Sequence, residues 1–153
     1  MKTIVITSGG FDPLTIGHAK YLKEAGKYGD YTLVVVNNDN WLKAKKGYAF
    51  MPEKERVEIL ETLLGEDYIV ILTEHAENPP DMSINEILRT LKQDLTGEVN
   101  LILVNGGDRT GDNIPEYKLC EELGIKMIFN VGGGKIQSSS NLVRTACENL
   151  RQI

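Results

Sequence analysis

A glycine-rich segment near the start of the chain carries the residue types expected of a phosphate site. Residues Ser8–His18 read SGGFDPLTIGH, with paired glycines, an aspartate, a threonine and a histidine. The segment separates the β-branched run Lys2–Thr7 from Ala19–Lys27, where apolar residues recur at helical spacing, so it is expected to join a strand to a helix. Glycine lets a backbone come close to a ligand, and a helix N-terminus offers N–H groups and partial positive charge. Such a loop is typical of phosphate binding.

His18 stands close to the expected helix start and has two interpretations. An imidazole beside a helix N-terminus and a bound anion polarises a phosphoryl oxygen, which would be a catalytic role. A histidine in this position also packs, partly buried, without any role in chemistry. Thr15, three residues earlier, predicts a helix cap or a phosphate contact, and the two roles are compatible.

A cationic cluster of Lys43, Lys45 and Lys46 follows the second apolar run and a polar turn at 37–40. We expect residues 41–47 to form a basic loop at the same edge of the sheet as the glycine-rich loop. One lysine, with Lys46 favoured, would close over a triphosphate; the alternative is a solvated loop. Arg56 lies in a helix that opens at Pro52, and it either pairs with neighbouring glutamates on an exposed face or contacts a phosphate.

Further polar side chains add to this picture. Ser138–Ser140 predict a helix cap, an anion site, or both. Asp12 and Asp39 would bind Mg²⁺ or sugar hydroxyls, or would finish turns. Asp108 would hold a ribose or substrate hydroxyl, whereas His75, in a loop rich in Glu and Asn, is expected to be exposed.

The elements that must position these residues alternate along the chain. Apolar runs predict strands at 2–7, 31–36, 68–72, 101–104 and 126–129. Helical patterns follow them at 19–27, 52–64, 83–95 and 115–123, and a last helix begins at the triple serine. This alternation predicts an α/β fold: a doubly wound, Rossmann-like, five-stranded parallel sheet of order 3-2-1-4-5, with helices on both faces.

In that order the switch point lies between the first and fourth strands. The loops leaving those strands are 8–18 and 105–111, and each contains a Gly-Gly pair and an aspartate. Ligands of doubly wound sheets bind at the carboxyl ends of the strands beside the switch point. The unusual loops therefore fall where the topology expects a site.

Length and charge limit the class of protein. At 153 residues the chain is expected to form a single domain, 1–153. The net charge of -5 argues against nucleic-acid binding through a broad basic face. No apolar run approaches the roughly 20 residues of a membrane span, no signal peptide is apparent, and the two cysteines lack metal-site spacing. These features favour a cytoplasmic protein with reduced thiols.

Several chemistries lack their motifs. The sequence contains no P-loop, no Gly-x-Ser-x-Gly elbow and no Gly-x-Gly-x-x-Gly fingerprint. Phosphate-holding groups without an evident nucleophile favour a reaction whose attacking atom is already an anion. Attack of a substrate phosphate on the α-phosphorus of a nucleoside triphosphate fits, with catalysis by positioning and charge stabilisation.

The motifs resemble those of the nucleotidyltransferase superfamily, which is cytidylyltransferase-like and carries an HxGH or TxGH signature. Gly9–His18 resembles the first signature, with Thr15 where cytidylyltransferases have histidine and phosphopantetheine adenylyltransferases have threonine. The remainder is most similar to the nucleotidyltransferase domain of ADP-heptose synthase. The similarity rests on Val36–Asp39, Lys46-Gly47, Glu55-Arg56, Asn105–Asp108 and Ser138–Leu142.

The resemblance implies roles for these positions. His18 and Thr15 would touch the triphosphate and stabilise the transition state, and Lys46 would hold phosphates, which makes these three the expected catalytic residues. The expected nucleotide-binding residues are Gly9, Gly10, Phe11, Gly17, Asn105, Gly107, Asp108, Ser138, Ser139 and Ser140. The expected substrate-binding residues are Asp12, Asp39, Lys43 and Arg56. Mg²⁺ is the implied cofactor, without an assigned protein ligand, and such enzymes are commonly homo-oligomers.

The expected reaction transfers a nucleoside monophosphate, with AMP favoured, from ATP or CTP to a phosphorylated sugar or small polyol and releases pyrophosphate. A glycerol-3-phosphate-type cytidylyltransferase using CTP is the alternative within the enzyme class, and phosphopantetheine is a less favoured acceptor. A nucleotide-binding regulator without turnover is the alternative outside it, favoured by Thr15 in place of the first histidine. Neither a nucleic acid nor a membrane is an expected partner.

Overall fold

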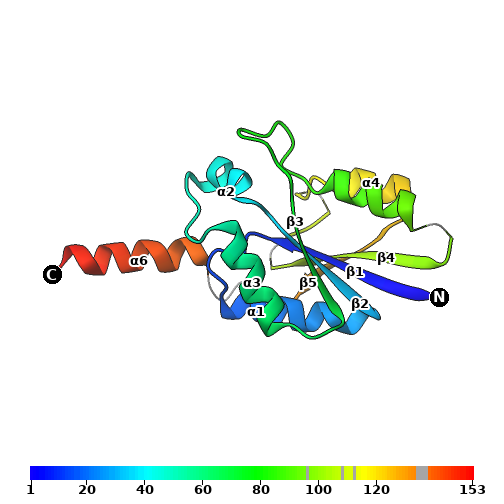
Figure 1. The fold of residues 1–153 in the computed structure, drawn as a ribbon, viewed down its shortest axis with the longest axis horizontal. Coiled ribbons are helices and arrows are strands. Elements are labelled where there is room, and N and C mark those ends of the chain that lie inside the picture. Colours follow the sequence, from blue (N-terminus) through cyan, green and yellow to red (C-terminus); the bar gives the residue numbers. More distant parts are fainter. Residues whose placement is uncertain (96, 108, 112, 134–137) are drawn as a thin grey trace.

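A parallel sheet forms the centre of the structure, a computed structural model that describes residues 1–95, 97–107, 109–111, 113–133 and 138–153 (Figure 1). Its strands pair in parallel in the order β3-β2-β1-β4-β5, which confirms the predicted topology. Their bounds are Lys2–Gly9 (β1), Tyr31–Val36 (β2), Tyr68–Leu72 (β3), Val99–Gly106 (β4) and Lys126–Val131 (β5). β1 therefore lies between β2 and β4, as the switch point requires.

Helices cover both faces of this sheet. Their bounds are Ile16–Ala25 (α1), Asp39–Lys46 (α2), Glu53–Leu63 (α3), Asn85–Asp94 (α4), Tyr117–Leu123 (α5) and Ser139–Arg151 (α6), with a 3₁₀ turn at Gly26–Tyr28. Leu22 of α1 and Leu60 of α3 pack with Val34 and Val36 on one face. On the other face, Leu88 of α4 and Leu119 of α5 share a core cluster with strand residues Leu33, Val35, Leu101 and Leu103. Alternate residues of β2 thus point into different cores, which explains its continuous apolar sequence.

The expectation of a basic loop at 41–47, after a polar turn at 37–40, is wrong. Most of this segment is helix α2, which begins at Asp39 and ends at Lys46. Asn38 caps it by accepting a hydrogen bond from the backbone N–H of Trp41 at 3.0 Å, and Leu42 is buried. Gly47 ends it with a positive φ of 87°. A capping asparagine and a C-terminal glycine are ordinary helix signals, so the lysines lie on a helix rather than on a loop.

Helix α6 projects away from the rest of the molecule toward the C-terminus (Figure 1). Ser138 caps it, with its Oγ accepting from the N–H of Asn141 at 3.3 Å, so the predicted serine cap is present. Along the helix no described residue is buried, and Leu142 and Leu150 are exposed. Among the described helices, none is long and apolar enough to span a bilayer.

Candidate functional site

The loop between β1 and α1 is held in a tight, buried conformation. Phe11 has a φ of 51°, a left-handed value that non-glycine residues rarely adopt, and only 2% of its surface is exposed. A Cβ at Gly9 would lie 3.1 Å from the Phe11 ring, and a Cβ at Gly10 would lie 2.8 Å from Leu42 Cδ2. A side chain at either glycine would therefore crowd Phe11 or Leu42 of α2, and the loop backbone lies at the carboxyl edge of the sheet.

Thr15 and His18 form a reciprocal cap at the start of α1. The backbone N–H of Thr15 donates to His18 Nδ1 at 2.9 Å, and Thr15 Oγ1 accepts from the N–H of His18 at 3.4 Å. Because a backbone N–H can only donate, Nδ1 acts as an acceptor, and a neutral imidazole then carries its proton on Nε2. The edge of the Phe11 ring packs against the imidazole, with centroids 5.1 Å apart. The cap interpretation of Thr15 is thus observed, and it orients His18 at a helix N-terminus.

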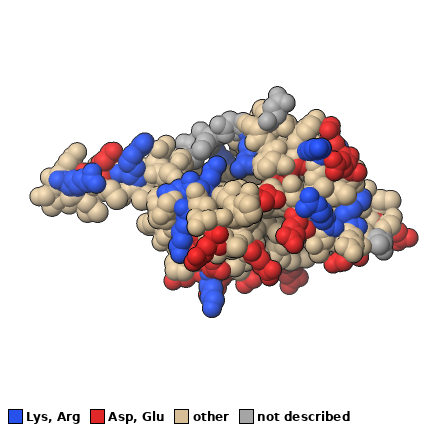
Figure 2. All heavy atoms as spheres, turned by 90° about the horizontal axis from the view of Figure 1, so that it is seen from above, with Lys and Arg blue, Asp and Glu red and all other residues tan. Residues whose placement is uncertain are grey.

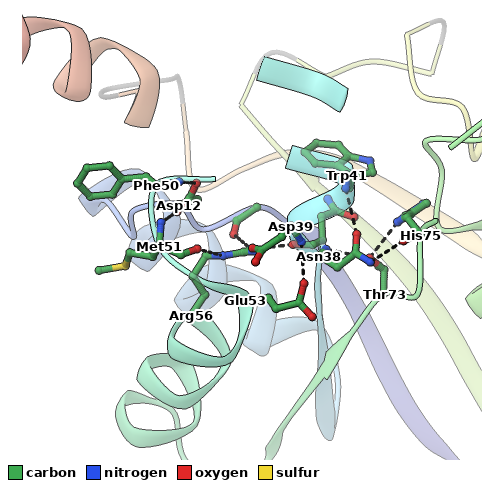
Figure 3. A network of polar contacts seen from close by, with 12 residues as sticks. Asp12, Asn38, Asp39, Trp41, Phe50, Met51, Glu53, Arg56, Thr73 and His75 are labelled. Carbon is green, nitrogen blue, oxygen red and sulfur yellow. Dashed lines mark hydrogen bonds and ion pairs between the residues drawn. The ribbon is translucent and has the colours of Figure 1, made fainter. Parts of the chain in front are cut away.

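Asp12 and Lys46 form an ion pair that joins this loop to the end of α2. Lys46 Nζ lies 3.1 Å from Asp12 Oδ2 and donates to the Asp12 backbone oxygen at 2.9 Å. The Asp12 carboxylate also accepts from the N–H groups of Phe50 and Met51, both at 2.6 Å (Figure 3). The carboxylate is buried and its oxygens are engaged by the protein, which favours its turn-holding role over direct contact with a metal or hydroxyl.

Arg56 is buried rather than exposed, so of its two interpretations the pairing with neighbouring glutamates on an exposed face is wrong. Its side chain, 1% exposed, donates to the backbone oxygens of Met51 at 3.0 Å, Gly10 at 2.7 Å and Asn37 at 2.6 Å. Its Nη2 donates to Asp39 Oδ1 at 2.7 Å. One guanidinium therefore ties together the β1–α1 loop, the end of β2 and the segment before α3. This geometry favours loop support over phosphate contact for Arg56, and over contact with Mg²⁺ or a sugar hydroxyl for Asp39.

His75, expected to be exposed, is instead half-buried in a network that ties the loop after β3 to α2 (Figure 3). Its Nε2 lies 3.0 Å from the Ser83 backbone oxygen, and its Nδ1 lies 2.9 Å from Thr73 Oγ1. A carbonyl only accepts, so Nε2 carries a proton. Asn38 adds two contacts, from its N–H to Thr73 Oγ1 and from its amide to the His75 backbone oxygen. Composition gave no sign of this network, because its partners are set by the fold.

A cavity of about 640 Å³ lies between this tied loop and α4, lined in part by Thr73, His75, Ser83, Ile87 and Leu91. None of the residues singled out in the sequence as site residues lines it. It is therefore separate from the contacts that assemble the β1–α1 loop.

Tyr21 of α1 links β1 and β4, the two strands at the switch point. Its hydroxyl donates to the Val104 backbone oxygen at 2.5 Å and accepts from the Ser8 N–H at 3.4 Å. Burial raises the pKa of this phenol well above its ordinary value, so it stays protonated. A Cβ at Gly106 would lie 3.0 Å from the Tyr21 ring, so the glycine lets β4 end close to it. Gly107 follows with a φ of 62°.

The sequence candidates are brought together in part. Ser139 Oγ donates to the Pro13 backbone oxygen at 2.7 Å, which attaches the start of α6 to the β1–α1 loop. Gly17 lies in the first turn of α1 and Asn105 is buried in β4, while Ser140 and Lys43 are exposed. Asp108 lies outside the described residues. Basic and acidic side chains are interspersed across the face drawn in Figure 2.

The geometry matches a known family over most of the chain. The model of the family described as "Cytidylyltransferase-like" matches residues 6–133, which run from within β1 to beyond the end of β5 and include the glycine-rich loop. The chain belongs to the cytidylyltransferase-like family. Membership of this family confirms the resemblance that the first signature indicated.

Relatives of this cytidylyltransferase-like chain include two proteins named bifunctional protein HldE. The one from Syntrophotalea carbinolica is 33% identical over 155 residues, which cover 99% of this chain and 28% of the relative. The one from Aliarcobacter butzleri is 34% identical over 150 residues, covering 97% of this chain and 28% of the relative. The chain thus spans less than a third of the length of these relatives.

Solved structures share the fold. A lipopolysaccharide core biosynthesis protein from Thermoplasma volcanium superposes with a TM-score of 0.64 at 24% identity, covering 85% of this chain and 97% of that one. A putative nicotinate-nucleotide adenylyltransferase from Vibrio parahaemolyticus gives a TM-score of 0.65 at 13% identity, covering 97% and 89%. At these identities the likeness concerns the fold.

Proposed function

We propose that this chain transfers an adenylyl group from ATP to a phosphorylated sugar or small polyol and releases pyrophosphate. The observation that carries the proposal is the orientation of His18. Its Nδ1 accepts from the Thr15 N–H at the N-terminus of α1, beside the glycine-rich loop of a cytidylyltransferase-like chain. A neutral imidazole held this way directs an N–H donor, rather than a base, at a phosphate.

In the proposed reaction an oxygen of the acceptor phosphate attacks the α-phosphorus of the nucleotide. The bond between the α-phosphorus and the oxygen that bridges to the β-phosphorus breaks, and pyrophosphate leaves with the electron pair. His18 Nε2–H and Lys46 stabilise the charge that develops on the phosphoryl oxygens, and Thr15 positions His18. Neither role requires a general base, because the attacking phosphate oxygen is already an anion.

The remaining candidates divide into two groups in this proposal. The first group binds the nucleotide through the glycine-rich loop, the end of β4 and the serines at the start of α6. Its members are Gly9, Gly10, Phe11, Gly17, Asn105, Gly107, Asp108, Ser138, Ser139 and Ser140. Lys43 contacts the acceptor directly, while Asp12, Asp39 and Arg56 maintain the acceptor side through the contacts described above.

Mg²⁺ enters this proposal as the complex with the nucleotide. Among the described residues, no three His, Cys, Asp or Glu side chains gather as a metal site, and Asp12 and Asp39 are paired with Lys46 and Arg56. These carboxylates do not form a dedicated magnesium cage. Mg²⁺ commonly keeps water and substrate phosphates as most of its ligands, so it would arrive on the triphosphate and neutralise its charge.

The test is a pyrophosphate-release assay with Mg²⁺ that crosses ATP and CTP against heptose 1-phosphate, hexose 1-phosphates, glycerol 3-phosphate and phosphopantetheine. Signal with ATP and a sugar phosphate supports the proposal, and signal with CTP and glycerol 3-phosphate supports the cytidylyltransferase alternative. No release with any pair, together with a thermal shift on nucleotide binding, would favour the regulator. His18→Asn serves as the catalytically impaired control.

A further inference from the structure

Asn37 continues strand β2 by one residue and places its side chain on a defined side of the sheet. The Asn37 N–H donates to the Gly9 oxygen at 2.9 Å, and the Thr73 N–H donates to the Val36 oxygen at 2.9 Å, so the ladder extends past Val36. Leu33 and Val35 point to the core shared with α4 and α5. Side chains alternate along a strand, so Asn37 lies on that same side, at the carboxyl edge.

The amide of Asn37 is buried without a complete set of partners. The residue is 5% exposed, and its Oδ1 accepts no hydrogen bond from the part of the chain that the structure describes. Buried polar atoms are nearly always paired, because leaving one unpaired costs free energy. An unpaired buried acceptor at the ligand-binding edge of a doubly wound sheet indicates a donor supplied by a ligand.

A second amide shows the same state on the other flank of β1. Asn105 of β4 is 7% exposed, and its Nδ2 has no hydrogen-bond partner within the described residues. It follows Leu101 and Leu103 at alternate positions, and both of these lie in the core cluster beneath α4 and α5. The two incomplete amides therefore border the C-terminal end of β1 from both neighbouring strands, on one side of the sheet.

The surroundings of Asn37 assign it to the acceptor rather than to the nucleotide. Its backbone oxygen accepts from Arg56 at 2.6 Å, which fixes its position. The next residue, Asn38, caps α2, the helix that carries Lys43 and Lys46. Asn105, in contrast, lies next to the glycines that end β4.

We propose that Asn37 is a specificity-determining residue whose amide oxygen accepts a hydrogen bond from a hydroxyl group of the phosphorylated acceptor. This inference rests on the proposed function and narrows the acceptor to a molecule with a free hydroxyl group near its phosphate, as in a sugar or polyol phosphate. A hydroxyl group supplies the donor that the buried oxygen lacks. A site built to bind a hydroxyl also discriminates against analogues without it, because the amide then stays unpaired.

The test compares Asn37→Leu, which has the same branched shape and number of heavy atoms but no polar atoms in its side chain, with Asn100→Leu as a control. Asn100 is exposed at the opposite end of β4. Two readouts are used: the midpoint of urea unfolding without ligand, and calorimetric binding of heptose 1-phosphate and glucose 1-phosphate in the presence of a non-hydrolysable ATP analogue. We expect Asn37→Leu to keep or raise the midpoint, to weaken sugar-phosphate binding by about tenfold or more, and to change binding of the ATP analogue by less than about twofold.

A lower unfolding midpoint for Asn37→Leu would overturn the inference, because it would mean that the amide has a structural partner. Unchanged sugar-phosphate binding, or a loss confined to the ATP analogue, would overturn it as well. Failure of the proposed function would give a different result. Wild-type protein would then bind the sugar phosphate and Asn37→Leu would bind it more weakly, yet neither would release pyrophosphate. If wild-type protein binds neither sugar phosphate, the acceptor assignment of Asn37 is wrong.

Discussion

The backbone N–H of Thr15 donates a hydrogen bond to Nδ1 of His18 at 2.9 Å, within a reciprocal cap at the start of α1. A threonine therefore stands where cytidylyltransferases have histidine without leaving His18 unsupported. The contact selects the tautomer with its proton on Nε2. One short segment of helix N-terminus thus supplies an oriented N–H donor together with the partial positive charge of the helix.

His18→Asn is expected to reduce turnover by about 10²–10³, as loss of one charge-stabilising donor does in other enzymes. The asparagine oxygen can still accept from the Thr15 N–H, so stability should change little, and nucleotide affinity should fall much less than turnover. Steady-state pyrophosphate release and calorimetric nucleotide binding check the two parts. Unchanged turnover would remove His18 from the mechanism.

Asp12→Asn is expected to destabilise the protein by about 1–3 kcal/mol, because an amide cannot replace every hydrogen bond that the buried carboxylate accepts from Phe50, Met51 and Lys46. Urea unfolding measures the change, with Asp94→Asn, exposed at the end of α4, as the charge-matched control. The acceptor KM should also rise, since Lys46 loses its anchor. Equal stability of the two variants would show that the Asp12 contacts contribute little.

Arg56→Lys is expected to lower stability by about 2 kcal/mol or more although the charge is kept. A lysine ammonium cannot reproduce the planar fork that reaches Met51, Gly10, Asn37 and Asp39 together. Arg151→Lys, at the exposed end of α6, is the control for the same chemical change. Chemical denaturation distinguishes the interpretations: a loss of phosphate binding at unchanged stability would favour a direct phosphate contact.

The two cysteines are expected to differ in reactivity and in their effect at alkaline pH. Burial raises the pKa of the Cys120 thiol from 9.0 to about 11, whereas Cys147 is exposed. A thiol reagent at neutral pH should therefore modify Cys147 and reach Cys120 only after unfolding.

The same pKa shift makes stability depend on pH. The folded state holds the Cys120 proton more tightly than the unfolded state, so this contribution is complete below about pH 9 and is lost as pH rises toward 11. Urea midpoints of the wild type and Cys120→Ala between pH 8 and 11 measure it. Tyr21, whose pKa is also raised, contributes equally to the pH dependence of both proteins. The difference between their urea midpoints as a function of pH therefore reports Cys120 alone. Identical slopes would contradict the assignment.

Local patterns in the sequence predicted most of the architecture. Continuous Val and Ile runs predicted strands buried on both faces, and their alternation with helices predicted the order β3-β2-β1-β4-β5 that the structure confirms. The serine cap of α6 was also predictable, because a cap is made between residues close in sequence. The same signals were present for α2, at Asn38 and Gly47, but the dense lysines obscured them.

Contacts between distant residues were decided by the tertiary structure alone. The sequence left Arg56 with either a surface pairing or a phosphate contact, yet the fold buries it against Gly10, 46 positions away. Asp12 meets Phe50, and Asn38 meets Thr73 and His75, across similar separations. Residue type and periodicity determine which side chains are able to pair and which face of an element is apolar. Only the packing of elements against one another determines which partners meet, and whether an amide such as that of Asn37 is left with an oxygen for a ligand.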